Sequence, residues 1–564
     1  MMTFKKITGA AILMAGLMMV SCSEGEDLTT MGINDNSSTN NGADTSAVDA
    51  VVIEDNADDF IENTTFADTI EVVFTNGSAN VKGEADGVTV TLDGGDIIVN
   101  STTNNFIMYV LSGTTNNGMF KLYSDRKWGI TLKDVDITND DGPAINVQSG
   151  KRGFVVLADG TTNRLADGSV YASSSEDQKG TLFAEGQMCF SGAGSLTIDA
   201  HAKSAINSDD YLYFRHSGTI SVTASNGNAV RGKDRVTVRA GSLNITASGN
   251  GKKGIKSDGR VVFNGGTTII TTTGAAVYDT DEGDIAGVSG VKCDSTFTMN
   301  EGELTIKCSG KGAKGISTDM GAVFNGGTLL VTTTGTTYTY SRLLDSKAKG
   351  VKADGNITIN GGSLTVNATG GEGSEGIEAK NIILVTGGTV YVTSYDDALN
   401  SAGDMTISGG TVFGYGMNND GLDSNGNMFL RGGVVMGFGG KTPEEGLDVA
   451  ENKYLSITGG HVIGLGAALM TKPSASVTKQ YCWVTTASMS KNADISVTTG
   501  SETYSFPFKT PLSLNMAYVV LSTPAMSANS AVSLSIGSSS TTGNLGNTVV
   551  TSNAGGGFPG GRAF

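Results

Sequence analysis

The sequence predicts an all-β protein: a right-handed, single-stranded parallel β-helix with a small antiparallel β cap at its C-terminal end. First, a pattern of roughly 23 residues recurs through residues 191–470, a period typical of stacked supersecondary units. Each repeat holds a short apolar strand, a Gly pair, a second strand, and a small residue before an aliphatic one. Second, apolar and polar residues alternate after each Gly pair, as in Leu243 and Ile245, which indicates strands with one buried face.

The Gly pair predicts a corner of each coil, where side chains would obstruct stacking. Coils stacked about 4.8 Å apart use their backbone groups fully. Crossovers between parallel strands are almost always right-handed, which sets the expected hand. The second Gly of the pair recurs at Gly194, Gly218, Gly241, Gly266, Gly302, Gly327, Gly362, Gly388, Gly410, Gly433 and Gly460, so we expect roughly a dozen coils.

Residues 1–21 are predicted to be a lipoprotein signal peptide. Lys5 and Lys6 precede an apolar run too short to span a bilayer comfortably. The run ends in "MVSC", which resembles a lipobox, so Cys22 is expected to be lipidated. The acidic residues that follow resemble a surface-export signal. We therefore expect a surface-exposed outer-membrane lipoprotein that contacts the membrane only through its lipid anchor; a plain secreted protein is the alternative.

The other segments are assigned by composition and strand pattern. Residues 22–65 are rich in Asn, Ser, Thr, Asp and Gly, which predicts a disordered tether. Residues 66–190 contain strands of irregular length and are expected to form the N-terminal cap and first coils. Residues 471–536 contain strands without the Gly pair, which predicts a small antiparallel β unit. Residues 537–564 are expected to be a flexible Gly-rich tail.

Charge and cysteine content narrow the function classes. The net charge of −18 argues against a nucleic-acid partner, because nucleic-acid-binding proteins carry basic patches. It suits an extracellular surface or a protein that binds divalent cations. The cysteines after the signal peptide show no metal-binding spacing, and buried free thiols are expected at Cys189, Cys293, Cys308 and Cys482.

A ladder of charges changes sign along the repeats. We number each coil from the small residue before the aliphatic one. Position −1 is Lys253, Ser289, Lys314 and Lys349 in the first half, then Glu375, Asp397, Asp420 and Glu445. Position +2 is Lys256, Lys292, Ser317 and Lys352, then Glu378, Asn400, Asp423 and Asp448.

The first half carries its own counter-charge. Position +4 is Asp258, Asp294, Asp319 and Asp354, on the same face as the lysines at +2. We expect these lysines to pair with these carboxylates, with a polyanion site as the alternative.

The carboxylates beyond Lys380 have no such partner, and crowded oxygen ligands are what Ca²⁺ coordinates. A solvated acidic ridge is the alternative. The predicted calcium ligands are Asp396, Asp397, Asn400, Asn419, Asp420, Asp423, Glu444, Glu445 and Asp448.

Two insertions, after Gly274 and after Gly335, leave the repeat at the same point two coils apart. Insertions on one face of a solenoid often mark its binding side. Aromatic rings stack on sugars, and an Arg can fork a carboxylate. The predicted carbohydrate-binding residues are Tyr278, Tyr338, Tyr340 and Arg342, with simple length variation as the alternative.

A strip of outward apolar residues follows the later repeats, including Phe413 and Phe438. A strip this long is expected to be covered. The C-terminal unit or a glycan could cover the strip, or a change of strand register could bury its side chains.

The stretches "DDGPAINVQSGKRGFVVLADG" and "SSSEDQKGTLFAEG", with the "GIKSDG…FNGG" repeats, resemble a bacterial carbohydrate-binding β-helix family. The resemblance covers roughly residues 70–535. It implies a right-handed β-helix similar to polysaccharide lyases, bound calcium, and non-catalytic binding of acidic or cellulosic polysaccharides.

Three functions stay open at this point: a glycan-binding surface protein, a calcium-dependent polysaccharide lyase, and an adhesin or structural spike. The sequence contains no nucleophile elbow and no HExxH motif. A lyase would need a base beside the metal, and Arg431 is the nearest candidate. We therefore expect a binding protein rather than an enzyme.

Overall fold

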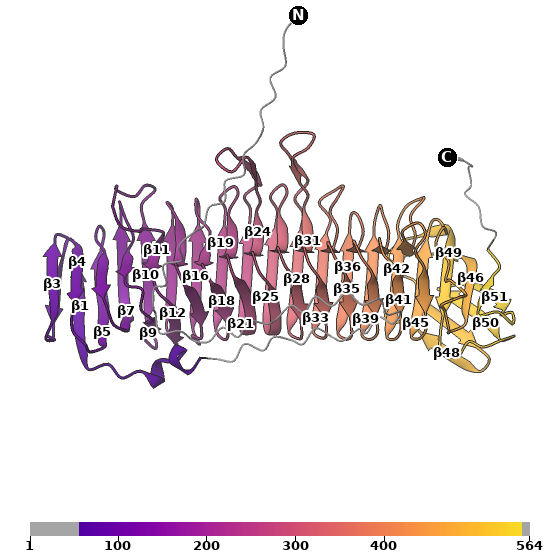
Figure 1. Ribbon diagram of the computed structural model, residues 1–564, viewed down its shortest axis with the longest axis horizontal. Helices are drawn as coiled ribbons and strands as arrows, with labels where there is room; N and C mark the ends of the chain where they lie inside the picture. The colour runs from indigo at the N-terminus through magenta and orange to yellow at the C-terminus, as the bar shows by residue number, and fades with distance from the viewer. Residues whose placement is uncertain (1–55, 555–564) are drawn as a thin grey trace, which may run out of the picture. The chain divides into compact units, whose positions relative to one another are not determined.

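The computed structural model describes residues 56–554, which form an all-β solenoid of parallel, stacked coils with an antiparallel C-terminal unit (Figure 1). This confirms the predicted fold class. Each coil contributes one strand to a 15-stranded sheet, here sheet B, and one long or two shorter strands to a 29-stranded sheet, here sheet A, which also includes strands of the C-terminal unit. The predicted signal peptide and the lipidation site at Cys22 lie outside the described residues.

Sheet B runs along one side of the solenoid, and its first two strands form an antiparallel hairpin. Its strands are β3 Val88–Asp93, β4 Asp96–Ser101, β6 Phe120–Ser124, β8 Ile145–Gln148, β11 Gly180–Ala184, β14 Ser204–Ser208, β17 Val230–Gly232, β20 Lys253–Ser257, β24 Ser289–Cys293, β26 Lys314–Thr318, β31 Lys349–Ala353, β34 Ile377–Ala379, β37 Leu399–Ser401, β40 Leu422–Ser424 and β43 Leu447–Val449.

The strand that follows sheet B in each coil belongs to sheet A and leads to the corner; β1 Asp68–Thr75, the first strand of this series, precedes sheet B in the chain. These strands are β1 Asp68–Thr75, β5 Ile107–Thr115, β7 Trp128–Asn139, β9 Gly153–Leu157, β12 Met188–Gly192, β15 Tyr211–Phe214, β18 Arg235–Val238, β21 Arg260–Thr272, β25 Phe297–Cys308, β27 Ala322–Phe324, β32 Ile357–Ile359, β35 Ile383–Val385, β38 Met405–Ile407, β41 Met428–Leu430 and β44 Leu455–Ile457. The long strands β21 and β25 continue through the corner. At β1, the short strand β2 Ser78–Lys82 pairs antiparallel.

The second sheet A strands follow the Gly corner. They are β10 Thr162–Asp167, β13 Ser195–Ala200, β16 Thr219–Ala224, β19 Ser242–Ala247, β28 Thr328–Thr333, β33 Ser363–Ala368, β36 Thr389–Ser394, β39 Thr411–Gly416, β42 Val434–Gly439 and β45 His461–Gly466. At the corner itself the coils touch backbone to backbone: a Cβ on Gly388, whose φ is +80°, would lie 2.8 Å from the Gly362 carbonyl oxygen. The corner therefore requires glycine.

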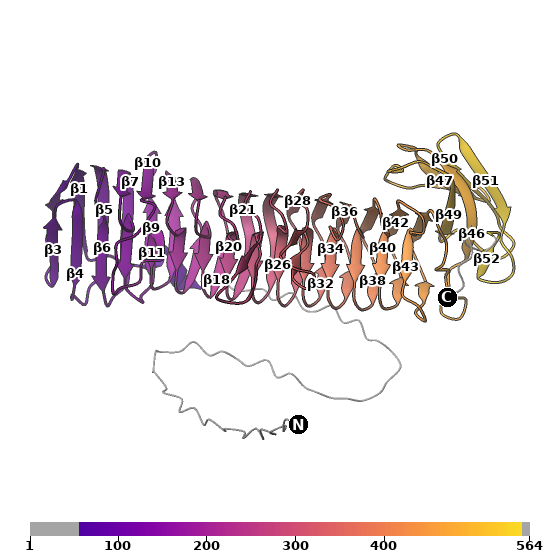
Figure 2. The same ribbon diagram turned by 90° about the horizontal axis from the view of Figure 1, so that it is seen from above.

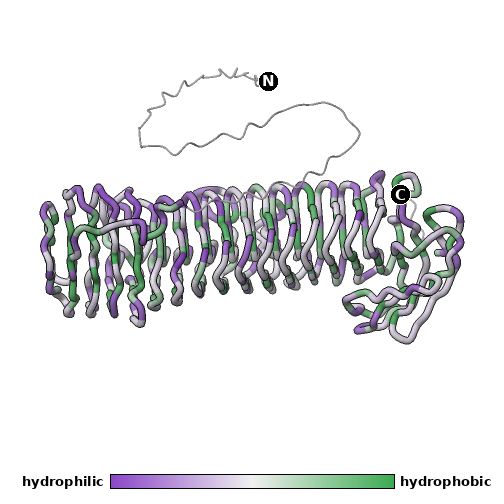
Figure 3. Tube along the Cα trace, turned by 90° about the horizontal axis from the view of Figure 1, so that it is seen from below, coloured by the Kyte–Doolittle hydropathy of each residue, from purple (hydrophilic) through white to green (hydrophobic). Residues whose placement is uncertain are grey.

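The interior of the coils is filled by the alternating aliphatic and aromatic residues. Figure 3 shows hydrophobic and hydrophilic residues alternating along the strands. Leu243, Ile245, Leu364 and Val366 are all buried in one continuous core, as their spacing predicted. The four cysteines expected to be free thiols are buried and unpaired, which confirms that prediction.

The C-terminal unit covers the end of the stack (Figure 2). Its strands are β46 Cys482–Met489, β47 Ile495–Thr499, β48 Glu502–Ser505, β49 Leu514–Ser522, β50 Ala531–Ile536, β51 Ser539–Asn544 and β52 Val550–Ser552. Strand β49 pairs antiparallel with β45, the last coil strand. Trp483 and Phe506 pack in one cluster with Phe413 and Phe438, so this unit is the cover of the outward apolar strip.

The structure differs from the predicted tail, because strands β51 and β52 lie within residues 537–564. Strand β51 pairs antiparallel with β50, and β52 pairs parallel with β46. Strand β51 has the sequence "SSTTGN" and lies at a sheet edge with its side chains largely exposed. It therefore lacks the apolar alternation by which a strand is predicted.

The structure also differs from the predicted tether, because residues 56–66 form a strap across the outside of the coils. Two short 3-10 helices, η1 Ala57–Asp59 and η2 Ile61–Asn63, lie in the strap. The Asp59 carboxylate is buried and accepts a hydrogen bond from Tyr211 while lying 3.0 Å from Arg152 Nε. Glu62 pairs with both terminal nitrogens of Arg215, at 2.8 and 2.6 Å. Polar composition predicted disorder here, but these long-range ion pairs fix the segment.

Candidate functional site

One edge of the solenoid carries the predicted calcium ligands and the predicted carbohydrate-binding residues. We call it the loop edge: the place where the chain leaves the second sheet A strand of a coil and enters sheet B of the next. Both insertions leave the coils here as β-hairpins, β22 Val277–Asp279 with β23 Asp284–Ala286, and β29 Tyr338–Thr339 with β30 Asp345–Ser346. Figure 1 shows them projecting beyond the coils beside β24 and β31.

The two hairpins hold each other through their tyrosines. The rings of Tyr278 and Tyr340 stack with centroids 3.8 Å apart and planes within 3°. The Tyr278 backbone N–H donates to the Tyr338 hydroxyl at 3.1 Å. One face of each stacked ring is therefore covered by the other, and Tyr340 remains 53% exposed. Arg342 is exposed at the tip of the second hairpin.

The lysines at +2 in the first half are paired with the carboxylates at +4. Lys256 Nζ lies 3.3 Å from Asp258 in its own coil and 2.6 Å from Asp294 in the next coil. Lys292 pairs likewise with Asp294 and Asp319, and Lys352 with Asp354. Although burial opposes ionisation of Asp294, hydrogen bonds from Lys256 and Lys292 lower its pKa. This confirms that the first half neutralises its own +2 lysines.

The charge ladder changes from lysines to carboxylates next to Lys349. Its side chain is 8% exposed, and its ammonium lies 2.7 Å from Glu375 and 3.0 Å from Glu378. Lys380 pairs with the second of these carboxylates. Burial raises the pKa of Glu375, while the two ammoniums outweigh burial and lower the pKa of Glu378. The lysine half is thus joined to the acidic half by a buried ion-pair network.

The carboxylates at −1 in the acidic half face the backbone of the next coil. Asp397 Oδ1 accepts from the Asp420 N–H at 3.0 Å, and Asp420 Oδ1 accepts from the Glu445 N–H at 2.5 Å. Glu445 accepts in turn from the Thr471 N–H at 2.9 Å. One oxygen of each carboxylate therefore satisfies a backbone donor, and this column is also part of the coil stacking.

The remaining predicted calcium ligands surround this column. Asn400 donates to Asp397 at 3.0 Å, and Asn419 donates to Asp396 at 2.6 Å. Asp423 and Asp448 are register partners on β40 and β43. Glu444 is half-buried next to Glu445. The structure therefore brings the nine predicted oxygen-bearing side chains to successive coils of one edge.

These carboxylates lie in an environment that disfavours their charge. Burial, aided by neighbouring carboxylates, raises the pKa of Asp397 to about 8, that of Asp423 to about 7 and that of Glu445 to about 8. Burial raises the pKa of Asp420 to about 9 despite the hydrogen bond from Glu445. Beyond Lys380 no lysine or arginine of residues 56–554 forms an ion pair with them. Their chemistry is that of hard oxygen donors lacking a counter-cation.

Carboxylate geometry alone does not complete a metal centre. Within residues 56–554 no three His, Cys, Asp or Glu side chains are grouped so as to hold a metal ion. Arg431, the candidate lyase base, follows β41 at the Gly corner, where its guanidinium lies 5.1 Å from the Phe429 ring centroid. That corner is separated from the loop edge by a strand of each coil. The structure does not bring Arg431 to the acidic column.

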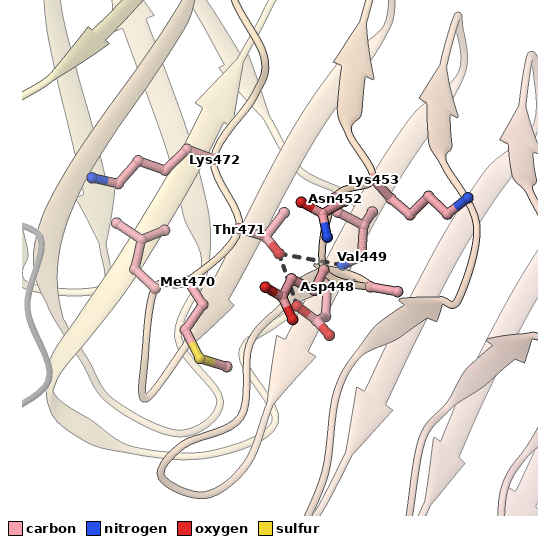
Figure 4. Close-up of a pocket in the computed structure, with 10 residues that line it drawn as sticks. Asp448, Val449, Asn452, Lys453, Met470, Thr471 and Lys472 are labelled. Atoms are coloured by element: carbon pink, nitrogen blue, oxygen red, sulfur yellow. Dashed lines mark hydrogen bonds between the residues drawn. The ribbon is translucent and has the colours of Figure 1, made fainter. Parts of the chain in front are cut away.

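The acidic column ends in a groove of about 840 Å³ between the last coil and the residues that lead to the C-terminal unit (Figure 4). Asp448 accepts a hydrogen bond from the Thr471 hydroxyl at 2.8 Å on its wall. Lys453 and Lys472 also line the groove. Sequence reasoning missed Thr471, because nothing in the repeat marks a residue beyond the last coil as a partner of the ladder.

No helix among residues 56–554 is both long and apolar enough to span a membrane.

The chain resembles known carbohydrate-binding proteins in two segments. Residues 93–259 and 334–421 match a family model described as carbohydrate-binding domain-containing protein. The second matched segment includes the β29–β30 hairpin, Lys349 and the acidic column as far as Asp420.

A protein of Acetivibrio thermocellus, described as a carbohydrate-binding domain-containing protein, is 29% identical over 122 residues. The match covers 21% of this chain and 42% of that relative, so less than half of the relative's length is matched. A solved structure, described as the polysaccharide lyase-like protein from C. thermocellum, is 24% identical with a TM-score of 0.37, and the match covers 46% of this chain and 96% of that one. The two matched segments and the Acetivibrio thermocellus relative confirm the predicted resemblance of this chain to the carbohydrate-binding domain family.

Proposed function

We propose that this chain binds polysaccharide at the cell surface without cleaving it, and that calcium stabilises its acidic half. The observation that carries the proposal is the family match over residues 93–259 and 334–421. The second of these segments contains the hairpin that presents Tyr340 and Arg342. An exposed aromatic ring beside a guanidinium suits a sugar ring and an anionic substituent.

In this proposal the hairpins are the binding side. The outer face of Tyr340 is the stacking surface, because its inner face is occupied by Tyr278. Arg342 lies two residues further along and donates hydrogen bonds to the same ligand. Tyr338 positions the pair through its hydroxyl rather than through its ring.

Calcium fits the donor set of the acidic column. Buried carboxylates without a cation would otherwise take up protons, and hard oxygen ligands of this kind suit Ca²⁺. Asp397, Asp420, Asp423, Glu445 and Asp448, which lie on three successive coils, are the side chains that would hold calcium between neighbouring coils. The ion would supply positive charge that replaces bound protons.

Binding without cleavage is favoured over lyase chemistry by the position of the cationic groups. Elimination from a uronate needs a base close to the metal-held carboxylate. Arg431 lies at another corner of the coil, and the Lys380 ammonium is engaged by Glu378. A lyase would release an unsaturated product that absorbs ultraviolet light, and we expect none.

The cell-surface location rests on the expected lipidation of Cys22 and the acidic residues after it. The full proposal is tested by a glycan array with the purified full-length protein, with and without Ca²⁺. Binding to a defined polysaccharide class supports it. An array without any bound glycan supports the structural-spike alternative instead.

A further inference from the structure

Two of the three lysines at −1, Lys253 and Lys314, differ from the lysines at +2 because no carboxylate of the described residues pairs with them. Lys253, Ser289, Lys314 and Lys349 are register partners on β20, β24, β26 and β31. Lys349 is engaged by Glu375 and Glu378. Within residues 56–554, Lys253 and Lys314 form no ion pair, since Asp294 and Asp354 are held by the +2 lysines.

Each of these two ammoniums has a single neutral partner. Lys253 Nζ donates to the Gly251 carbonyl oxygen at 2.9 Å, and Lys314 Nζ donates to the Ser346 hydroxyl at 2.8 Å. An ammonium has three donors, so most of their hydrogen-bonding capacity faces no acceptor of residues 56–554. Burial and neighbouring lysines lower the pKa of both side chains to about 8. A bound anion would relieve this cost of partly desolvated, unpaired charge.

Both lysines lie at the base of the hairpins. The first hairpin immediately precedes β24, between the two lysines along the stack. The second supplies Ser346, which holds Lys314. The side chains of the proposed stacking surface and the unpaired ammoniums are therefore parts of one stretch of the loop edge.

The distance between the two lysines matches the length of two sugars in an extended polysaccharide. The lysines are two coils apart, which separates them by about 10 Å along the solenoid axis. One sugar of an extended polysaccharide rises by about as much as one coil. Alternate sugars of a chain lying along the axis would meet Lys253 and Lys314, and the sugar between them would lie over the buried, neutral Ser289, where no ammonium is available.

We infer that Lys253 and Lys314 form an anion-binding subsite for a linear polysaccharide that carries a negative group on every second sugar. The inference rests on the proposed function and specifies its ligand. Lys349 ends the row, because its ammonium already holds two carboxylates. The subsite therefore takes two negative groups, one at each unpaired lysine.

Titration calorimetry of the full-length protein tests this with three probes: unsulfated chondroitin, whose carboxylates alternate; polygalacturonate, which has one on every sugar; and a neutral linear glucan. We expect chondroitin oligosaccharides to bind most tightly, because polygalacturonate sets a carboxylate against Ser289. Lys253→Gln and Lys314→Gln should each weaken chondroitin binding about tenfold, the loss of one charged hydrogen bond. Lys256→Gln is the matched control, since that lysine is already paired with Asp258 and Asp294.

Melting temperatures check that the variants fold; loss of an unpaired charge should leave them unchanged or higher. On the wild-type protein, sulfate should compete with chondroitin more strongly than chloride at equal ionic strength. Equal losses in Lys256→Gln, unchanged affinity in the Lys253→Gln/Lys314→Gln double variant, or no competition by sulfate would each overturn the inference. If the neutral glucan binds while chondroitin shows no preference, the inference fails and the proposed function stands; if no glycan binds, both fail.

Discussion

Asp420→Asn should have opposite effects on stability with and without calcium. The amide oxygen of Asn keeps the acceptor for the Glu445 N–H, so the hydrogen bond between coils is retained. The substitution removes only the ionisable group. Without calcium it should stabilise the protein near neutral pH, and with calcium it should remove most of the stabilisation that the ion gives to the wild type.

The size of the effect follows from proton uptake. Burial raises the pKa of Asp420 from its ordinary 3.8 to about 9. At pH 7 the carboxyl is protonated in the folded protein and ionised in the unfolded one, so folding takes up a proton. Because pH 7 lies about three units above the unfolded pKa, this proton uptake lowers the free energy of unfolding at pH 7 by about 4 kcal/mol. Because the folded pKa is raised, stability contributed by this group is complete below pH 4 and is lost as pH rises towards 9. Asn has no such loss.

Bound calcium should stabilise the folded wild-type protein. A ligand that binds only the folded state at a hundredfold excess over its Kd adds about 2.7 kcal/mol. Thermal unfolding of both proteins between pH 5 and 9, in chelator and in millimolar Ca²⁺, measures the two effects separately. The control is Asp258→Asn, because Asp258 pairs with Arg231 at 2.7 Å and its loss should destabilise with or without calcium. A wild-type melting temperature that is independent of both pH and calcium would refute the reasoning.

Cys22→Ala should leave the protein unlipidated and shift it from the membrane fraction to the soluble fraction; retention on the membrane would contradict the lipoprotein proposal. Deletion of residues 276–286 and 337–347 should weaken glycan binding while the coils stay folded, as array signal and circular dichroism would report; unchanged binding would remove the hairpins from the site. Asp59→Ala should remove the buried acceptor of Tyr211 and one of the two carboxylates that pair with Arg152, Asp58 being the other; it should cost about 2 kcal/mol and open the strap to limited proteolysis. A strap as resistant as in the wild type would show that Asp59 is not needed to hold it.

The coils could be predicted because their signal is local and repeated. Gly388 and its counterparts recur at a fixed interval, and the alternation of Leu364 and Val366 has the period of a strand. The pairing of Lys256 with Asp258 and Asp294 also followed from the two-residue period. Each of these features is determined within one coil or between adjacent coils.

The parts that could not be predicted depend on contacts distant in sequence. Asp59 meets Tyr211 across 152 residues, and no local pattern marks it as buried. The sequence predicted the carboxylate partners of the lysines at +2, but it did not show that Lys253 at −1 would contact only the Gly251 carbonyl oxygen. The stacking of Tyr278 on Tyr340 likewise needed the orientation of two hairpins that sequence leaves free.

The strap has a consequence for the order of biosynthesis. Its residues are made before the coils, but the partners of Asp59 and Glu62 extend as far along the chain as Arg235 at the start of β18. The strap cannot dock until that part of the chain has been translated and has folded. A segment that waits in this way is accessible to proteases before docking and protected from them afterwards. Docking of the strap would then mark completion of the first coils.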